Sequence, residues 1–327
     1  MVDRAEVQKF GSFNNQVVCS FFEQTVESSF PTTITSGMTI DFVAPNTTLK
    51  DEDGNHWNVT RFYDHSHATM LSIGNDKDGR KMYEQVPEVA RGYRGMVSNT
   101  RNADSHATKS LMSIPGTEPF SYRRWVDRVQ WDEGELLSLT GVRAAPALSW
   151  YLPSAKGGLM FTSYISKVEG TILGKKCEGF SEFATHWCAP GNSFIDEWAA
   201  VGIAWLIVCN EYTDGSRHLC HIGLGRDDLR FALIADEKGP CIATTDVDLK
   251  IGLDEGRYPK TLDWQIAGQH WHWEGKPSGD MGNPAMGIER GREGVARLVG
   301  DPRQVRLAYG WVNFYADDRI DPYVVTG

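Results

Sequence analysis

The chain lacks an excess of basic residues. Its 33 Lys and Arg residues are outnumbered by 43 Asp and Glu residues, which gives a formal net charge of −10 over 327 residues. Nucleic acids and anionic membranes attract proteins through clustered positive charge. The longest cationic runs here are pairs such as Arg123-Arg124 and Lys175-Lys176. We therefore expect no nucleic-acid partner.

Long apolar runs and a leader-like start are also missing. No apolar stretch approaches the ~20 residues that a membrane-spanning helix needs. The first residues, Met-Val-Asp-Arg, are not a basic segment followed by an apolar one. We expect no membrane span and a cytoplasmic location.

The usual cofactor and metal motifs are absent as well. The six cysteines never occur with C-x-x-C spacing, which indicates reduced thiols rather than a zinc ribbon or a redox pair. Neither a dinucleotide-binding G-x-G-x-x-G pattern nor a phosphate-binding P-loop occurs, and there is no G-x-S-x-G nucleophile elbow. We expect no cofactor, no metal and no serine-hydrolase chemistry.

What the chain does contain is a β-strand pattern. Alternating or β-branched segments recur throughout, at 32–43, 58–73, 92–98, 121–131, 136–142, 159–168, 205–211, 218–224, 229–235, 247–252, 261–267 and 305–316. Asp53-Gly54, Asp78-Gly79 and Asp214-Gly215 are dipeptides typical of hairpin turns. Helical periodicity is scarce, and its best candidate, 194–206, is equally compatible with a strand. The pattern predicts an all-β protein.

A turn-rich stretch near the midpoint suggests two domains. Residues 153–158 read Pro-Ser-Ala-Lys-Gly-Gly, the densest group of turn-forming residues in that region. We place the boundary there, which gives domains 1–155 and 156–327. Each half holds enough predicted strands for a β-barrel, whose cavity is a usual place for a ligand.

The segment 179–188 carries the first candidate site. On a strand, Glu182 and His186 share one face and Trp187 lies on the other. A carboxylate and an imidazole beside an aromatic ring suit proton transfer and cation stabilisation. The alternative is a histidine that is hydrogen-bonded in a barrel wall.

Tyr212 and Asp214 form the second candidate. Two residues apart on an extended strand, they face the same way, and a carboxyl group buried beside a phenol would have a raised pKa. Asp214 could then remain protonated and act as a proton donor. The alternative is an ordinary solvent-exposed turn, because Asp214 precedes Gly215. Trp205, in the strand before them, is a candidate for lining the cavity.

Asp64, His65 and His67 form a third cluster. His65 and His67 share a strand face, but spacing identifies no third ligand for a metal. We interpret Asp64 and His65 as a candidate acid-base pair and His67 as a substrate contact at a barrel mouth. In the segment 269–275, histidines alternate with Trp271 and Trp273, which line the cavity or else form the core side of a half-buried strand.

The order of motifs across about 165–290 resembles the two-domain lipocalin-like family. These motifs begin at Val168-Glu-Gly-Thr, Glu178-Gly-Phe-Ser-Glu, Tyr258-Pro-Lys-Thr and Trp273-Glu-Gly. The family includes carotenoid hydratases, kievitone hydratases and AttH-like proteins and, more distantly, lipocalin-type Diels–Alderases. The family's acidic-Asp-His-x-Trp-Gly string appears here as Phe183-Ala-Thr-His-Trp-Cys, with the preceding acid at Glu182.

The resemblance implies two lipocalin-like antiparallel β-barrel domains packed together. It also implies terpenoid, prenylated or similar apolar small molecules as substrates, without an organic cofactor. A homodimer is left open.

The function expected from these features is that of a hydratase, a lyase that adds water to a carbon-carbon double bond by acid-base catalysis. Glu182 or Asp214 would protonate the alkene, and Trp187 or another aromatic ring would stabilise the cation. His186 with Tyr212 would orient or deprotonate the attacking water. The alternatives are a cyclase or Diels–Alderase-type pericyclase, which needs mainly a shaped cavity, and a non-catalytic lipocalin-like binder of apolar ligands.

Overall fold

The computed structural model is an all-β fold with one α-helix in its described part, which confirms the predicted fold class. The described residues are 12–13, 16–22, 25, 37–64, 67–75, 95–110, 120–153, 157–227, 229–239, 241–283, 288–314 and 320–325. The strand pairings of the described residues within the two barrels are antiparallel, as in Asn46 opposite Glu182.

The chain divides into two compact units that are not successive halves of the sequence. The first barrel comprises Phe22–Ala147 and Phe161–Pro190, and the second comprises Met1–Phe21, Leu148–Met160 and Gly191–Gly327. The boundary expected at 155/156 falls inside one of these segments. Strand pairing explains the difference, because the strands after that boundary complete the first barrel.

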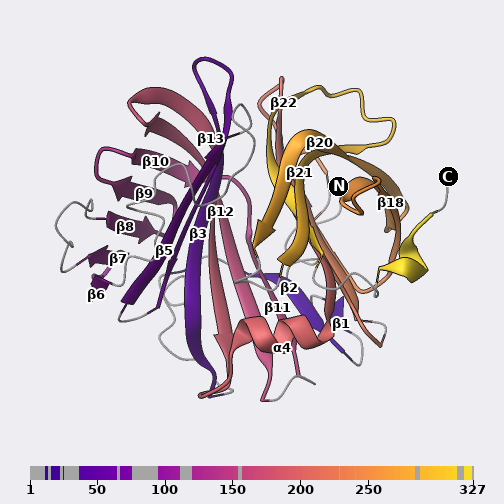
Figure 1. Ribbon diagram of the computed structural model, residues 1–327, viewed down its shortest axis with the longest axis horizontal. Coiled ribbons are helices and arrows are strands. Elements are labelled where there is room, and N and C mark those ends of the chain that lie inside the picture. Colours follow the sequence, from indigo (N-terminus) through magenta and orange to yellow (C-terminus); the bar gives the residue numbers. More distant parts are fainter. Residues whose placement is uncertain are drawn as a thin grey trace. The chain divides into compact units, whose positions relative to one another are not determined.

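The first barrel is a ring of ten strands. They are β3 (Thr39–Asp51), β4 (His56–Tyr63), β5 (His67–Asn75), β6 (Gly95–Arg101), β7 (Ser105–Ser110), β8 (Phe120–Trp125), β9 (Arg128–Glu133), β10 (Leu137–Arg143), β12 (Leu159–Ile172) and β13 (Lys175–Cys188). Their order is β12-β10-β9-β8-β7-β6-β5-β4-β3-β13, and pairing of β12 with β13 closes the ring. Figure 1 shows β3, β12 and β13 side by side.

The second barrel is a nine-stranded sheet. Its strands are β14 (Gly202–Tyr212), β15 (Arg217–Gly225), β16 (Arg230–Asp236), β17 (Cys241–Thr244), β18 (Val247–Leu253), β19 (Pro259–Ile266), β20 (Gln269–Asn283), β21 (Ile288–Leu298) and β22 (Val305–Phe314). They run in the order β17-β16-β15-β14-β22-β21-β20-β19-β18. Residues 245–246 join the two edge strands, β17 and β18, so the sheet curls nearly to closure.

The remaining elements are short. They are β1 (Ser12–Phe13), β2 (Val18–Phe22), β11 (Ala147–Leu152), the helix α4 (Phe194–Val201) and the 3-10 helix η3 (Asp321–Tyr323).

The ambiguous segment 194–206 is both a helix and a strand. Ser193 caps α4 by accepting a hydrogen bond from the Asp196 backbone N–H. The helix stops at Gly202, where β14 begins. A Cβ at this glycine would lie 2.5 Å from the Trp198 indole, so the close approach of the two elements requires glycine. Two of the expected Asp-Gly turns occur, at Gly54 and Gly215, with φ of 85° and 80°. The third, Asp78-Gly79, lies outside the described residues.

Each barrel has its own apolar core, to which alternate residues of most strands contribute. In the first barrel, the core also holds a buried ion pair between Arg61 and Glu133. Trp131 Nε1 donates to Glu133 Oε1 at 2.8 Å, which satisfies the carboxylate further. All six cysteines are buried and unbridged, as predicted.

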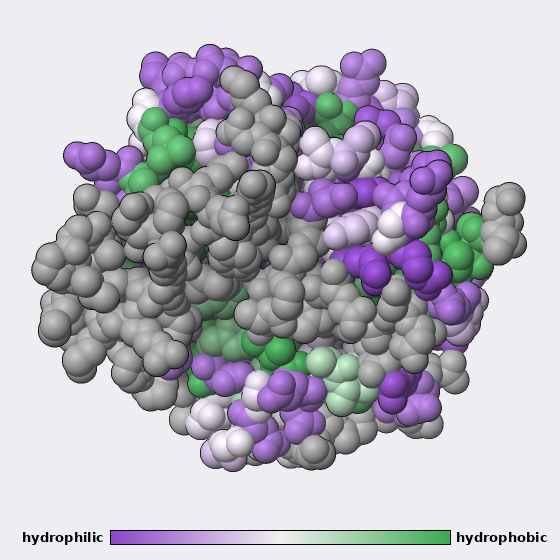
Figure 2. Space-filling view, viewed as in Figure 1, coloured by the Kyte–Doolittle hydropathy of each residue, from purple (hydrophilic) through white to green (hydrophobic). Residues whose placement is uncertain are grey.

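Large exposed hydrophobic side chains are scattered rather than clustered in sequence. Among the described residues they are Val18, Val142, Leu173, Val299 and Val325. On the face drawn in Figure 2, the described residues are mostly hydrophilic, with hydrophobic ones interspersed.

Candidate functional site

Glu182 is the central residue of the candidate site. It lies on β13, opposite Asn46 of β3, and is 2% exposed. Its Oε2 accepts a hydrogen bond from Asn46 Nδ2 at 3.1 Å, and its Oε1 accepts one from Ser163 Oγ at 2.6 Å. A buried carboxylate is costly unless hydrogen-bonded. These contacts offset that cost and fix the position of the carboxyl group.

His186 lies on the same strand face as Glu182, as predicted, but the two residues do not form a pair. Four residues along a strand separate their Cα atoms by about 13 Å. The His186 ring stacks on Phe42, with centroids 3.9 Å apart, and meets the edge of Phe161 at 5.2 Å. Burial lowers the pKa of His186 to about 3, so its imidazole is neutral near pH 7.

The face shared by Glu182 and His186 points away from the interior of the first barrel. Phe183, between them, belongs to the apolar core and packs on Tyr122 with centroids 5.1 Å apart. Successive residues of a strand point to opposite sides, so Glu182 lies on the outer face. The expectation that this group lies inside a barrel is therefore corrected. Trp187 follows a β-bulge and is 1% exposed.

Tyr212 and Asp214 belong to the second barrel, whereas Glu182 belongs to the first. Tyr212 ends β14 in the second barrel, where the Arg303 guanidinium lies 4.1 Å from its ring centroid. Burial raises the pKa of Tyr212 to about 12.

Asp214 lies in the turn after β14, where its side chain is 37% exposed. Lys238 Nζ donates to its Oδ2 at 2.5 Å, and Ser216 donates through both Oγ and backbone N–H. Lys238 first, and then Ser216, hold the pKa of Asp214 well below its usual range. The expectation of a protonated Asp214 is wrong, because the Asp-Gly turn places the carboxylate at the surface.

The third predicted cluster lies largely outside the described residues. Asp64 directly follows β4 and is half-buried. His65 is not among the described residues, and for His67 only the backbone position in β5 is described. Their roles remain predictions.

The aromatic candidates of the second barrel lie in two different settings. Trp205 packs among aromatic side chains, with ring centroids 5.4 Å from Trp198 and 4.7 Å from His221. Trp271 and Trp273 belong to the barrel core and are 0% exposed.

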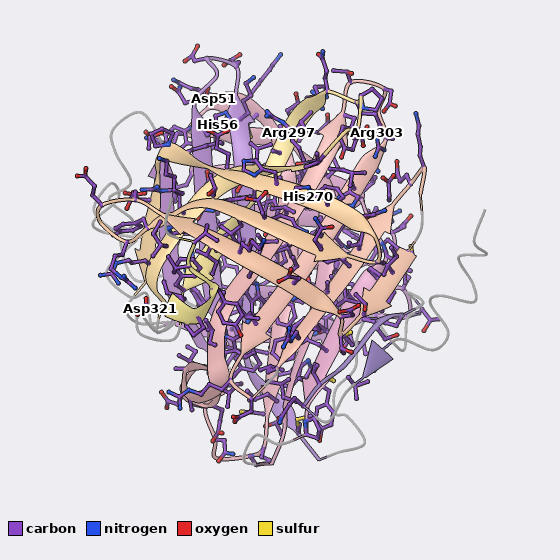
Figure 3. All side chains as sticks on the ribbon, turned by 90° about the vertical axis from the view of Figure 1, so that its right-hand side faces the viewer. Asp51, His56, His270, Arg297, Arg303 and Asp321 are labelled. Atoms are coloured by element: carbon purple, nitrogen blue, oxygen red, sulfur yellow. The ribbon has the colours of Figure 1, made fainter. Side chains whose placement is uncertain are left out.

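The histidines of β20 face outward. His270 and His272 both contact Asp263 Oδ1, at 3.2 and 2.9 Å, and Figure 3 shows His270 on this strand. In β20, the tryptophans therefore point into the core and the histidines point outward. This is the second of the two expected arrangements, in which Trp271 and Trp273 form the core side of a half-buried strand.

Sequence reasoning missed Asn46 and Ser163. Asn46 is 136 residues from Glu182, and only the pairing of β3 with β13 brings the two together. No motif marks either residue. Within the described part of the chain, no three His, Cys, Asp or Glu side chains form a group that could hold a metal ion. No helix there is long and apolar enough to cross a membrane.

No protein-family model and no curated protein sequence matches the chain. Eleven chains among the solved structures resemble it, including the following two. A candidate AttH protein from Nitrosomonas europaea is 13% identical, with a TM-score of 0.49 over 88% of this chain and 97% of its own. Kievitone hydratase from Nectria haematococca is 11% identical, with a TM-score of 0.48 over 91% of this chain and 94% of its own. Both names are among those given above for the family that the sequence motifs resemble.

Proposed function

We propose that this protein is a cofactor-independent hydratase, in which Glu182 transfers the proton. Its substrate would be an apolar small molecule with a carbon-carbon double bond, of the terpenoid or prenylated kind. The observation that carries the proposal is the buried Glu182 carboxyl group held between Ser163 and Asn46. The reaction agrees with the name of the fungal kievitone hydratase, but the proposal rests on the residues of this chain.

The Ser163 hydroxyl suits a carboxyl group that changes its protonation state. A hydroxyl both donates and accepts hydrogen bonds, and its hydrogen rotates to suit its partner. Ser163 can therefore donate to the Glu182 carboxylate or accept from the carboxylic acid at the same 2.6 Å separation. Asn46 Nδ2 donates to the other oxygen in either state. The carboxyl group can lose and regain a proton without moving.

The proposed reaction uses Glu182 first as an acid and then as a base. The carboxylic acid gives its proton to one alkene carbon, and the adjacent carbon becomes a tertiary cation. Water adds its oxygen to that cation and returns one proton to the Glu182 carboxylate. The sum is alkene plus water to alcohol. His186 does not serve as the base in this scheme, because it lies about 13 Å along the strand.

The aromatic end of the same face gives His186 a binding role. Phe42, Phe161 and the neutral His186 ring form an apolar group beyond Ala44 and Ala184, which are both small and buried. A hydrocarbon chain laid along this face would contact these rings while its double bond lies at Glu182. Burial of the hydrocarbon would supply the affinity.

The test compares Glu182→Gln with Glu178→Gln, a matched change on the same strand face at a half-buried position. The substrates are a prenylated phenol and an acyclic terpene, assayed for water addition. Because a general acid contributes about 10²–10⁴-fold, Glu182→Gln should lower turnover by that factor and leave substrate affinity nearly unchanged. Glu178→Gln should retain full turnover.

Deuterium labelling gives the second readout. In D₂O, the product should carry deuterium on the carbon next to the hydroxyl-bearing centre. If Glu182→Gln keeps full turnover, or if the product is cyclised and carries no solvent deuterium, the hydratase proposal is wrong and the protein is better explained as a pericyclase. Substrate binding without any product in the wild type would favour a non-catalytic binder.

A further inference from the structure

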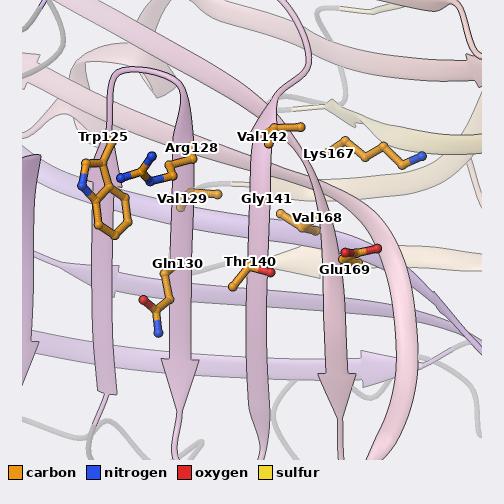
Figure 4. Close-up of a pocket in the computed structure, with 10 residues that line it drawn as sticks. All are labelled: Trp125, Arg128, Val129, Gln130, Thr140, Gly141, Val142, Lys167, Val168 and Glu169. Atoms are coloured by element: carbon orange, nitrogen blue, oxygen red, sulfur yellow. The ribbon is translucent and has the colours of Figure 1, made fainter.

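The outer surface of the first barrel carries a hollow that the proposed reaction does not use. It has a volume of about 480 Å³ and lies over β9, β10 and β12 beside Trp125 (Figure 4). This volume is within the range of small-molecule sites, roughly 300–1,000 Å³. Val129 and Val168 point into the core, so their strand neighbours form the walls of the hollow on the outside.

Two basic residues stand on either side of an apolar one in the hollow. Val142 pairs with Arg128 of β9 on one side and with Lys167 of β12 on the other. Adjacent strands lie about 4.8 Å apart, which puts the Cα atoms of Arg128 and Lys167 about 10 Å from each other. In Figure 4 the Arg128 guanidinium points toward Trp125 and the Lys167 ammonium points away from Val142, which is 56% exposed. Both long side chains must therefore turn inward to contact a group held over Val142.

Trp125 positions one of these cations. The Arg128 guanidinium carbon lies 4.6 Å from the centroid of the Trp125 ring, and the Arg123 guanidinium carbon lies at the same distance. Stacking on the ring orients Arg128 and leaves its charge unneutralised. Among the described residues, no carboxylate forms an ion pair with Arg128.

The next row of the hollow is polar and carries one negative charge. Thr140 pairs with Gln130 of β9 and with Glu169 of β12. Glu169 repels a second anionic group and accepts a hydrogen bond from a hydroxyl. The hollow thus combines two cationic side chains, the apolar Val142, the aromatic Trp125 and, one row away, the hydrogen-bond acceptor Glu169.

From this arrangement we infer that the hollow binds a small aromatic acid. Its carboxylate lies over Val142 between Arg128 and Lys167, and its ring lies along the hollow over Gly141 and Thr140. On a chain of net charge −10, the paired cations make this a local site of attraction for an anion. The site is independent of Glu182, so a ligand bound here is a second ligand and not the substrate of the proposed hydration.

Calorimetric titration of the full chain with 2-naphthoate tests this site. The variants are Arg128→Gln, Lys167→Gln and their combination, and the control is Lys250→Gln, an exposed lysine on β18 of the second barrel. Loss of one charge-assisted contact should weaken naphthoate binding about tenfold or more, and the combination should abolish it. Lys250→Gln should bind as the wild type does.

A neutral ligand of the same shape separates charge from apolar contact. We expect 2-naphthylmethanol to bind at least about tenfold more weakly than 2-naphthoate to the wild type. Equal affinity for the two ligands, unchanged binding by the double variant, or no naphthoate binding by the wild type would each overturn the proposal. Circular dichroism of every variant verifies the fold, since these side chains lie outside the core.

Discussion

Ser163 Oγ and Glu182 Oε1 lie 2.6 Å apart across the two strands that close the first barrel. Because the hydroxyl can reverse its hydrogen bond, it steadies the carboxyl group in both protonation states. This pair makes Ser163 a positioning residue for the proposed reaction.

We expect Ser163→Ala to lower turnover about tenfold while KM changes little. The loss is smaller than for Glu182→Gln, because Asn46 still holds the other carboxyl oxygen. Ser166→Ala is the matched control, a buried serine on the opposite face of β12. Steady-state kinetics distinguish the two variants, and equal losses in both would show that Ser163 acts only through the packing of β12.

Asp214→Asn should leave turnover unchanged. Its carboxylate is committed to Lys238 and Ser216 in a surface turn of the second barrel. Kinetics of this variant beside Glu182→Gln assign the proton donor. If Asp214→Asn loses most of its turnover and Glu182→Gln does not, Asp214 is the proton donor.

Removing one member of the buried Arg61–Glu133 pair should destabilise the fold strongly. Arg61 Nε donates to Glu133 Oε1 at 3.0 Å, and both side chains are at most 2% exposed. Arg61→Leu leaves a buried carboxylate without its cation, which costs about 3–5 kcal/mol in the free energy of unfolding.

The double variant Arg61→Leu with Glu133→Leu should cost less than Arg61→Leu alone, since no buried charge then remains. Urea unfolding of both variants measures this difference. A double variant that is less stable than either single variant would show that packing, and not charge, dominates at this position.

The fold should lose stability as the pH falls from about 6.5 to 5. Burial lowers the pKa of His218 to about 3, below its unfolded value of about 6.5. The unfolded chain therefore binds a proton in this window and the folded chain does not. The stability is present above pH 6.5 and is lost as the pH falls, by up to ~2 kcal/mol for one such histidine.

His218→Phe isolates this contribution. Phenylalanine keeps the stack on Trp271, whose ring centroid is 4.1 Å from that of His218, and removes the titrating group. Urea unfolding at pH 7 and pH 5 should show a smaller loss in the variant. Asp236, Arg303 and Asp301 also influence the charge of His218, but they keep their own charges in this window. An unchanged loss in the variant would assign the pH dependence to other groups.

Local sequence rules predicted the strands and some of the faces. Alternation placed Glu182 and His186 on one face, and the Asp-Gly rule located the turn at Gly215. The same turn rule was the better guide to Asp214, which is ionised at the surface.

What sequence could not supply was the register between distant strands. Whether Glu182 faces inward or outward depends on which strands lie on each side of β13, and Asn46 reaches it only through that pairing. The hollow beside Val142 likewise arises from three strands brought together by folding. Such contacts have no signature in any single segment.

Ring closure by β12 and β13 sets an order on biosynthesis. The strand β3 (Thr39–Asp51) pairs with β13 (Lys175–Cys188). The ribosome synthesises β13 more than a hundred residues after β3, so β3 has no partner on that side until then. A nascent chain that has reached residue 155 therefore carries an unclosed sheet whose edge can pair with other chains. Long-range pairing of this kind is slow. The interval of translation between these strands is thus when the first barrel is most exposed to aggregation and most in need of chaperone protection.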